Sequence, residues 1–340
     1  MLKSRKRIAL LICGLAVVGV IPVLALLATP QSEVISTAAS NYLNDPNAVF
    51  NISSGDLLMQ LFGKDKPFIL SVRTANDFAL GHIAGSVNIP FAKLFESSSL
   101  AKLPKDRKIV VSCYSGHLAS TAVALLNVCG YDATNLTWGI MGWSKDPAVA
   151  ITQFVDPEID RAAEANANAG SGDHTPPSVE FTHSSVKSEV LRAACAAYAA
   201  TGGRFINAAD LDQQLQEGGS DAPLVVSVRS PELYAAGHIP GAIHIPFLDI
   251  LDEENLRKLD PERTIVVVSD TGRLGGQAAA ILSTLGYDAY NLLWGMSGWT
   301  TDPAIAPERF NGSSSPDYPV QASEGAVPVE EESTGGTCGG

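Results

Sequence analysis

Apolar runs alternate with amphipathic segments along most of this chain, and the alternation occurs in two blocks. In the first block, residues 68–72 and 109–112 have the composition of buried strands, and residues 118–128 have the spacing of a helix. Gly130 follows that helix and suits a C-terminal cap. Strands that alternate with helices predict a parallel sheet covered by helices on both faces, so we expect an α/β fold.

The two blocks are copies of each other. Residues 68–147 align with 224–303 without a gap, and roughly 35 of 80 positions are identical. The same offset relates Tyr42 to Tyr198, which lie in segments expected to form a leading helix in each copy. The repeated unit is a whole domain, so the sequence predicts tandem domains and not a solenoid.

Composition divides the rest of the chain. We expect a membrane anchor or signal segment at 1–30, domains at 34–154 and 183–310, a linker at 155–182, and a disordered tail at 311–340. The linker is rich in Ala, Asn, Asp, Gly and Pro and lacks apolar periodicity. The tail is rich in Gly, Ser, Pro and Glu and has few large apolar side chains.

The N-terminal segment is typical of a membrane anchor. Lys3, Arg5, Lys6 and Arg7 precede an uncharged run from Ile8 to Ala28, which has the length of a membrane-spanning helix. Positive charge stays in the cytoplasm, so we expect a membrane-anchored protein whose soluble part is extracytoplasmic, either periplasmic or extracellular. The alternative is a protein secreted after cleavage near Ala28.

Charge and cysteine content exclude several classes of function. A net charge of −13 argues against nucleic acid as a partner, because phosphate binding needs clustered Lys and Arg. The five cysteines are odd in number and irregularly spaced, and they form no CxxC motif. We therefore expect neither a disulfide framework nor a metal site, and no cofactor.

Cys113 follows the second predicted strand, where ligands bind in parallel sheets. The chain must then turn tightly into a helix, and Gly116 relaxes the backbone at that turn. Backbone N–H groups from Tyr114 to Leu118 are expected to point at the sulfur, with the positive end of the helix behind them. Both effects favour a reactive thiolate.

These residues and their surroundings resemble the rhodanese family of sulfurtransferases. The resemblance covers both copies and rests on the segments Gly81-His82-Ile83-Ala84-Gly85-Ser86-Val87-Asn88-Ile89-Pro90, Cys113-Tyr114-Ser115-Gly116-His117, Gly130-Tyr131 and Gly142-Trp143. It implies transfer of sulfane sulfur through a persulfide of Cys113. It also implies that the loop backbone binds the substrate, here at Tyr114, Ser115, Gly116, His117 and Leu118.

The chain departs from the family pattern at several positions. Ser71 and Ser227 stand where the family commonly has aspartate, and His117 is the one candidate cation in the Cys113 loop. In the second copy Ser269 replaces the cysteine, and Asp270 follows it and disfavours an anion. A serine nucleophile needs an adjacent base, so we interpret the second copy as a structural or binding module.

Residues that recur in both copies are expected to serve the architecture. His82 and His238 are interpreted as structural hydrogen-bonding residues, and Arg73 and Arg229 as partners of a carboxylate inside the fold. Two further cysteines are interpreted as packing positions, because Cys129 aligns with Leu285 and Cys195 aligns with Ala39.

Cys338 lies in the glycine-rich sequence that ends the chain, Gly335-Gly336-Thr337-Cys338-Gly339-Gly340. This arm resembles the C-terminal arm of sulfur-carrier proteins in thiosulfate-oxidising systems. Cys338 is therefore a candidate sulfur acceptor, and the alternative is an incidental thiol in the tail.

The leading hypothesis is an extracytoplasmic sulfurtransferase that moves sulfur from a small thiosulfate, polysulfide or persulfide donor through Cys113 to a thiol acceptor. The partners expected are that donor and acceptor, the membrane through the N-terminal helix, and a sulfur-relay protein. The alternative is a non-catalytic sulfur-carrier or assembly module. A cysteine phosphatase is disfavoured, because such enzymes need an arginine where Ala119 stands.

Overall fold

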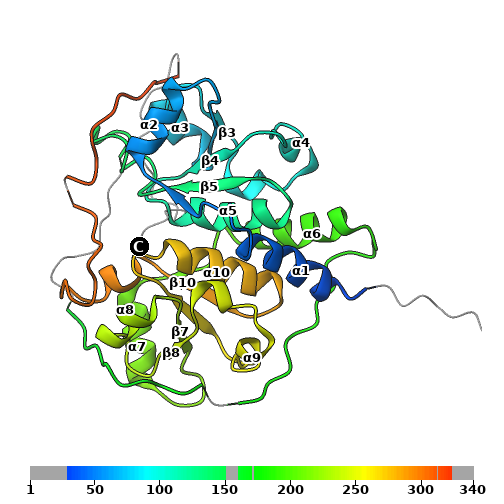
Figure 1. The fold of residues 1–340 in the computed structure, drawn as a ribbon, viewed down its shortest axis with the longest axis vertical. Coiled ribbons are helices and arrows are strands. Elements are labelled where there is room, and N and C mark those ends of the chain that lie inside the picture. Colours follow the sequence, from blue (N-terminus) through cyan, green and yellow to red (C-terminus); the bar gives the residue numbers. More distant parts are fainter. Residues whose placement is uncertain (1–28, 151–159, 171, 312, 324–340) are drawn as a thin grey trace, which may run out of the picture.

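Two parallel five-stranded sheets follow one another along the chain in the computed structural model, which describes residues 29–150, 160–170, 172–311 and 313–323 (Figure 1). The first sheet has the strand order β1-β5-β4-β2-β3. Its domain contains α1 (Gln31–Leu43), β1 (Asn51–Ile52), α2 (Ser54–Phe62), β2 (Phe68–Ser71), α3 (Ala75–Leu80), β3 (Val87–Asn88), η1 (Phe91–Lys93), α4 (Ser97–Leu100), β4 (Ile109–Ser112), α5 (His117–Val128) and β5 (Ala133–Leu136).

The second sheet repeats this topology in the order β6-β10-β9-β7-β8. Its domain contains α6 (Lys187–Ala199), β6 (Phe205–Ile206), α7 (Ala208–Glu217), β7 (Leu224–Ser227), α8 (Pro231–Ala236), β8 (Ile243–His244), η2 (Phe247–Asp249), α9 (Glu253–Leu256), β9 (Ile265–Val268), α10 (Arg273–Thr284), β10 (Ala289–Leu292) and η3 (Gly295–Gly298). The predicted α/β fold with tandem parallel sheets is confirmed.

The central strand β4 is buried on both faces, which explains the apolar sequence from Ile109 to Val111. Ile109 and Val111 belong to the apolar cluster that includes α5, while Val110 belongs to the cluster on the opposite face with Leu57 of α2. Because the strand is covered on both sides, its carboxyl end is the point at which a side chain can meet a ligand.

The helices α5 and α10 pack against each other along the interface between the domains (Figure 1). The leading helix α1 reaches across this interface, where the Tyr42 hydroxyl donates to Oε1 of Gln277 on α10. The Phe50 and Phe247 rings also meet edge to face across it, with centroids 5.1 Å apart. The loops that precede α5 and α10 are therefore held close together.

Each domain also binds a segment that comes directly after the other domain in the sequence (Figure 1). Residues 160–164, the first crossing segment, lie on the second domain, where Glu164 and His238 exchange two backbone hydrogen bonds of 2.9 Å. Residues 318–323, the second crossing segment, lie on the first domain, where Gln321 and His82 exchange bonds of 2.8 and 3.0 Å. The exchange is reciprocal, since His82 and His238 occupy equivalent positions in the repeat.

The equivalent tryptophans fix the same two segments. The indole Nε1 of Trp299 donates to the carbonyl of Ala162 at 2.8 Å, and that of Trp143 donates to the carbonyl of Pro319 at 3.0 Å. Tyr318 packs edge to face on Trp143, with ring centroids 5.0 Å apart. The same Trp and His pair thus binds a crossing segment in each domain.

Described parts of the expected linker and of the expected tail contact the two domains. The described parts of 155–182 contact the second domain, as the bond from the His174 amide to the Arg257 carbonyl at 2.9 Å shows. In the expected tail, residues 318–323 pair with the first domain. Composition suggested loops, but backbone pairing and tryptophan contacts stabilise segments that have little apolar periodicity of their own.

No helix in the described ranges is long and apolar enough to cross a membrane. The predicted membrane span at 8–28 and Cys338 both lie outside the described residues.

Candidate active site at the Cys113 loop

Cys113 comes directly after β4, and α5 begins four residues later at His117. Gly116 makes this tight turn with φ +92°, and a Cβ atom there would lie 3.2 Å from the Leu136 carbonyl oxygen. A positive φ and so little space both favour glycine. The strand–turn–helix geometry predicted for the loop is present.

Backbone amides converge on the Cys113 sulfur. The Gly116 amide donates to Sγ at 3.1 Å, and the amides of Ser115, Leu118 and Ala119 also bond to it. The cradle was predicted over Tyr114 to Leu118, so the sequence missed Ala119. Its amide is free to bond the sulfur because the first amides of a helix have no partner inside that helix.

Burial dominates the ionisation of Cys113. Its thiol has no exposed surface, and desolvation raises its pKa, while the amides of Ala119, Gly116, Ser115 and Leu118 lower it. The amides therefore favour the thiolate as predicted, but burial opposes them and the net direction of the pKa is upward. A thiolate in this site needs further positive charge.

Arg73 supplies such a charge from the end of β2, beside β4. Its side chain is 1% exposed, and its guanidinium lies 5.8 Å from the centroid of the Tyr114 ring. The guanidinium donates to the backbone carbonyls of Asp77 and Gly81, and its Nε has no partner among the described residues. Burial lowers the pKa of Arg73, whereas Tyr114, Asp77 and Cys113 raise it.

The expected carboxylate partner of Arg73 is occupied elsewhere. The Asp77 carboxylate accepts hydrogen bonds from the hydroxyls of Thr74 and Tyr114, and within the described residues it forms no ion pair with Arg73. A cationic group that stays protonated in proteins is thus buried near enough for its charge to interact with Cys113, with part of its bonding capacity unused.

The second domain neutralises the equivalent arginine. Arg229 Nε donates to the Asp270 carboxylate at 2.7 Å, as the sequence predicted for a carboxylate partner. Asp270 occupies the position of Tyr114 in the repeat, and Ser269 occupies that of Cys113. The Ser269 hydroxyl is buried, and no residue in the described part of the chain hydrogen-bonds to it as an activating base would.

His117 lies at the domain interface and not in an exposed loop. Its ring is fully buried, with Nδ1 2.8 Å from Ser115 Oγ and Nε2 3.0 Å from the Thr271 carbonyl oxygen. The Trp294 ring meets it edge to face at 4.5 Å. Burial lowers the pKa of His117 to about 4, so it is neutral at pH 7 and is not the loop cation that the sequence suggested.

The loop after β5 holds the Cys113 loop from the other side. The Ile140 amide donates to the Cys113 carbonyl at 2.9 Å, and the Met141 amide to the Tyr114 carbonyl at 3.1 Å. Gly139, with φ +54°, allows this approach, because a Cβ there would lie 2.6 Å from the Cys113 oxygen. This second clamp was not recognised in the sequence.

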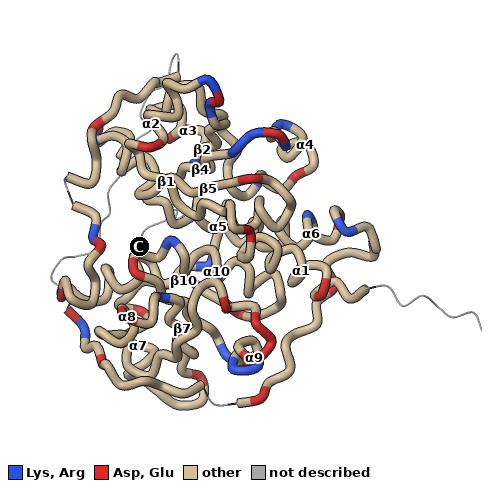
Figure 2. The backbone as a smooth tube through the Cα atoms, viewed as in Figure 1, with Lys and Arg blue, Asp and Glu red and all other residues tan. Residues whose placement is uncertain are grey.

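The degenerate loop of the second domain borders the site. Arg273 lies over the Trp138 ring at 4.4 Å and pairs with Glu308 at 2.8 Å. Figure 2 shows charged residues mainly on outer helices and loops, while α5 carries none along its length. The Cys113 loop therefore directly precedes α5, a helix without charged side chains that packs between the two domains.

Three of the predicted loop residues make contacts through their side chains. Tyr114 binds Asp77, and Ser115 contacts the His117 ring. Leu118 is buried in the core. In the described ranges, no group of three or more His, Cys, Asp or Glu side chains could hold a metal ion.

The fold and this loop define an α/β protein that presents one cysteine at the carboxyl end of a parallel strand, in a ring of backbone amides. The family model for the rhodanese-like domain matches residues 54–146 and 207–302, so the chain belongs to the rhodanese-like domain family. Both copies, including the one that has lost the cysteine, are members.

Curated relatives match one domain at a time. The chain is 38% identical over 94 residues to the thiosulfate sulfurtransferase GlpE of Pseudomonas fluorescens, covering 27% of this chain and 82% of the relative. It is 30% identical over 98 residues to a sulfurtransferase of Allochromatium vinosum, covering 28% of this chain and 90% of the relative.

A longer relative is the probable adenylyltransferase/sulfurtransferase MoeZ of Mycobacterium tuberculosis. The identity is 35% over 78 residues, which is 23% of this chain and 20% of the relative. The chain therefore spans about a fifth of that protein's length.

Proposed function

We propose that the protein is a sulfurtransferase that carries sulfane sulfur as a persulfide of Cys113. The observation that carries this proposal is the convergence of backbone amides on the Cys113 sulfur, together with the buried guanidinium of Arg73, whose charge interacts with Cys113. Amides and a buried cation stabilise an anionic sulfur, whether it is the attacking thiolate or the persulfide that forms.

The transfer takes place in two displacements. The Cys113 thiolate attacks the outer sulfur of the donor, the donor's S–S bond breaks, and the remainder leaves with the bonding electrons. A thiolate acceptor then attacks the terminal sulfur of the persulfide and regenerates the Cys113 thiolate. Because Cys113 has no exposed surface, the donor reaches it only after a neighbouring side chain moves.

Arg73 offsets part of the cost of burying negative charge during both steps. Its buried guanidinium takes the place of the cation that His117 does not provide. This charge suits small anionic donors, including thiosulfate, the donor named for the GlpE relative.

The test is intact-mass and peptide analysis after incubation with thiosulfate, polysulfide and low-mass persulfide donors. The parent protein should gain about 32 Da for each sulfur on the Cys113 peptide, and Cys113→Ala should not. Ser269→Ala is the matched control at the equivalent loop and should load like the parent. Equal loading or transfer by Cys113→Ala would contradict the proposal.

A carrier or assembly role is the second candidate, and the unreactive Ser269 loop favours it for the second domain. Catalytic turnover with excess acceptor supports an enzyme, whereas a single stoichiometric loading supports a carrier. A relative named as a putative sulfur carrier, YrkF of Bacillus subtilis, matches over 77 residues at 31% identity.

Cys338 is proposed as the acceptor within the same chain. The described chain ends at Ser323, whose amide donates to the Ala79 carbonyl of α3 at 2.8 Å, on the Cys113 domain. Cys338 lies fifteen positions after Ser323, and such a length of chain spans at most about 50 Å. Sulfur that appears on the Cys338 peptide only when Cys113 is present would support this relay.

An extracytoplasmic location with a membrane anchor belongs to the same proposal. Its support is the basic cluster followed by an uncharged run at 8–28. Fractionation of cells that express the full chain, followed by protease treatment of intact cells or spheroplasts, tests it. Recovery of the protein in the cytosolic fraction would contradict it.

A further inference from the structure

Two thiols distant from Cys113 meet at the boundary between the domains. Cys129 caps the C-terminus of α5, Cys195 lies within α6, and their Sγ atoms are 3.5 Å apart. Both are free cysteines, although 66 residues separate them in the chain. The two sulfur atoms are in contact, and the sequence had suggested only packing for each.

The repeat shows that packing does not require thiols here. The positions equivalent to Cys129 and Cys195 in the other copy are Leu285 and Ala39, both buried. Leucine and alanine therefore satisfy the architecture at one boundary. At the other boundary, cysteine stands at both positions, and the two side chains contact each other.

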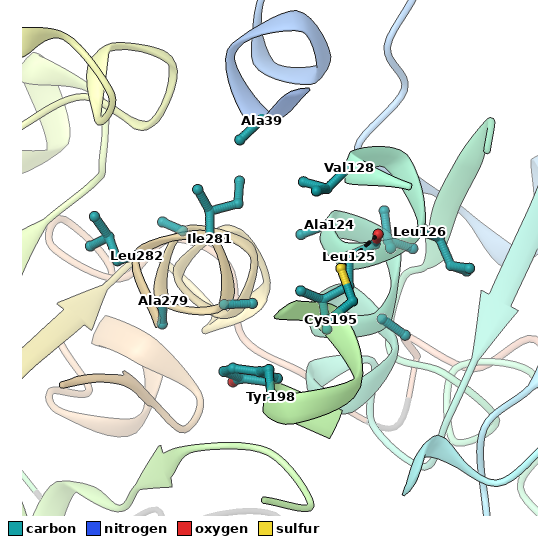
Figure 3. Close-up of a cluster of buried hydrophobic side chains, with 14 of the residues drawn as sticks. Ala39, Ala124, Leu125, Leu126, Val128, Cys195, Tyr198, Ala279, Ile281 and Leu282 are labelled. Carbon is teal, nitrogen blue, oxygen red and sulfur yellow. Dashed lines mark hydrogen bonds between the residues drawn. The ribbon is translucent and has the colours of Figure 1, made fainter. Parts of the chain in front are cut away.

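The two thiols differ in access. Cys195 is fully buried, and Figure 3 shows its sulfur directed from α6 toward Leu125 on α5, whose carbonyl oxygen lies 3.5 Å away. Cys129 is partly exposed, and the Lys105 ammonium bonds to its carbonyl at 3.3 Å. A small reagent can thus reach Cys129 before Cys195, and the ammonium of Lys105 lies beside the Cys129 backbone.

We propose that Cys129 and Cys195 form a second reactive site, a dithiol that small-molecule disulfides oxidise to a disulfide joining α5 to α6. The Cys129 thiolate attacks one sulfur of the reagent, its S–S bond breaks, and one thiol leaves. Cys195 then attacks Cys129 in the mixed disulfide and releases the second thiol. Two protein thiols are oxidised and one reagent disulfide is reduced to two thiols.

This site acts independently of the Cys113 loop. Cys113 precedes the first turn of α5 and Cys129 follows its last, so the helix separates them by about 18 Å. The disulfide would instead fix the leading helix of the second domain to the first domain. It closes a long loop, and such a crosslink restricts the unfolded chain most.

The experiment treats the reduced full-length protein with oxidised glutathione, blocks remaining thiols by alkylation, and maps the cysteine peptides. The parent should yield a peptide that joins Cys129 to Cys195. The Cys195→Ala variant should stop at a glutathione adduct on Cys129, and Cys129→Leu should leave Cys195 free. Cys113→Ser should form the crosslink like the parent.

The two substitutions introduce the residues that occupy the equivalent positions in the repeat, so they suit the fold. Thermal unfolding of the parent provides a second test, with Cys195→Ala as its control. Its unfolding temperature should rise on oxidation, return on reduction, and stay unchanged in Cys195→Ala. A stable glutathione adduct on Cys129 in the parent, or no reaction of either thiol, overturns the proposal.

Discussion

Arg229 donates its Nε hydrogen to the carboxylate of Asp270 across 2.7 Å, and the arginine in this ion pair is buried. In the first domain the equivalent arginine, Arg73, faces Tyr114 instead and keeps Nε unpaired. The thiol and the unneutralised arginine occur in the same domain, and both are absent from the other. The proposed sulfur transfer at Cys113 thus rests on a charge relationship as well as on a nucleophile.

Replacing Tyr114 by aspartate should reproduce this ion pair in the first domain. We expect Tyr114→Asp to lower the rate of sulfur loading at Cys113 at least about tenfold, because a charge-assisted pair removes the cation from the sulfur. Stopped reactions followed by mass spectrometry measure the rate. Tyr114→Phe, which removes only the hydroxyl, is the control, and equal rates in the two variants would exclude the charge effect.

Gly139→Ala should displace the Cys113 loop. Its Cβ would lie 2.6 Å from the Cys113 oxygen and 2.8 Å from the Tyr114 oxygen, so the loop backbone must move. We expect sulfur loading to fall by more than about tenfold. Gly130→Ala is the matched control, since it too has a positive φ but open space around its Cβ. Similar losses in both variants would point to general destabilisation.

The buried His117 should make stability depend on pH. Its pKa is about 4 in the folded protein, below the ordinary value of 6.5, so the unfolded chain binds a proton over this window and the folded chain does not. Stability should therefore fall by about 3 kcal/mol between pH 7 and pH 4, and this contribution should level off below pH 4.

Chemical denaturation at several pH values measures this slope. The His117→Gln variant cannot take up the proton, so its pH dependence should be shallower by that amount. An unchanged slope in the variant would assign the pH dependence to other groups.

Removing the second crossing segment should destabilise the domain at the opposite end of the chain. A protein that ends at residue 311 loses the cover of Trp143 and His82, and we expect the first domain to lose about 2 kcal/mol. Hydrogen exchange in the two domains locates the loss. Deletion of 326–340 removes Cys338 but keeps the segment, and should leave the stability of the first domain unchanged.

The strands and helices that are buried on both sides were predictable from the sequence. The runs at β2, β4 and α5 are apolar because each is covered by the rest of its domain, and local composition records this directly. The position of Cys113 followed from β4. The crossing segments could not be predicted, since they are held by backbone pairing with His82 and His238, which leaves no period in their own sequence.

The role of Arg73 becomes visible only when the partners of the equivalent arginines in the two domains are compared, and composition does not give those partners. The arginine recurs in both domains and therefore suggested architecture, yet its partner changes from a carboxylate to Tyr114. The sequence did contain a signal for this change of partner, because Tyr114 stands in the first copy where Asp270 stands in the second. The burial of His117 could not be predicted from the sequence, because it depends on contact with Thr271 and Trp294 of the other domain.

The exchange of crossing segments also determines when the first domain can be completed during protein synthesis. The ribosome makes the Cys113 domain first, but the residues that cover its Trp143 emerge only after the second domain has been translated. A premature stop codon near the end of the gene would therefore spare the whole sequence of the Cys113 domain and still leave that domain unfinished.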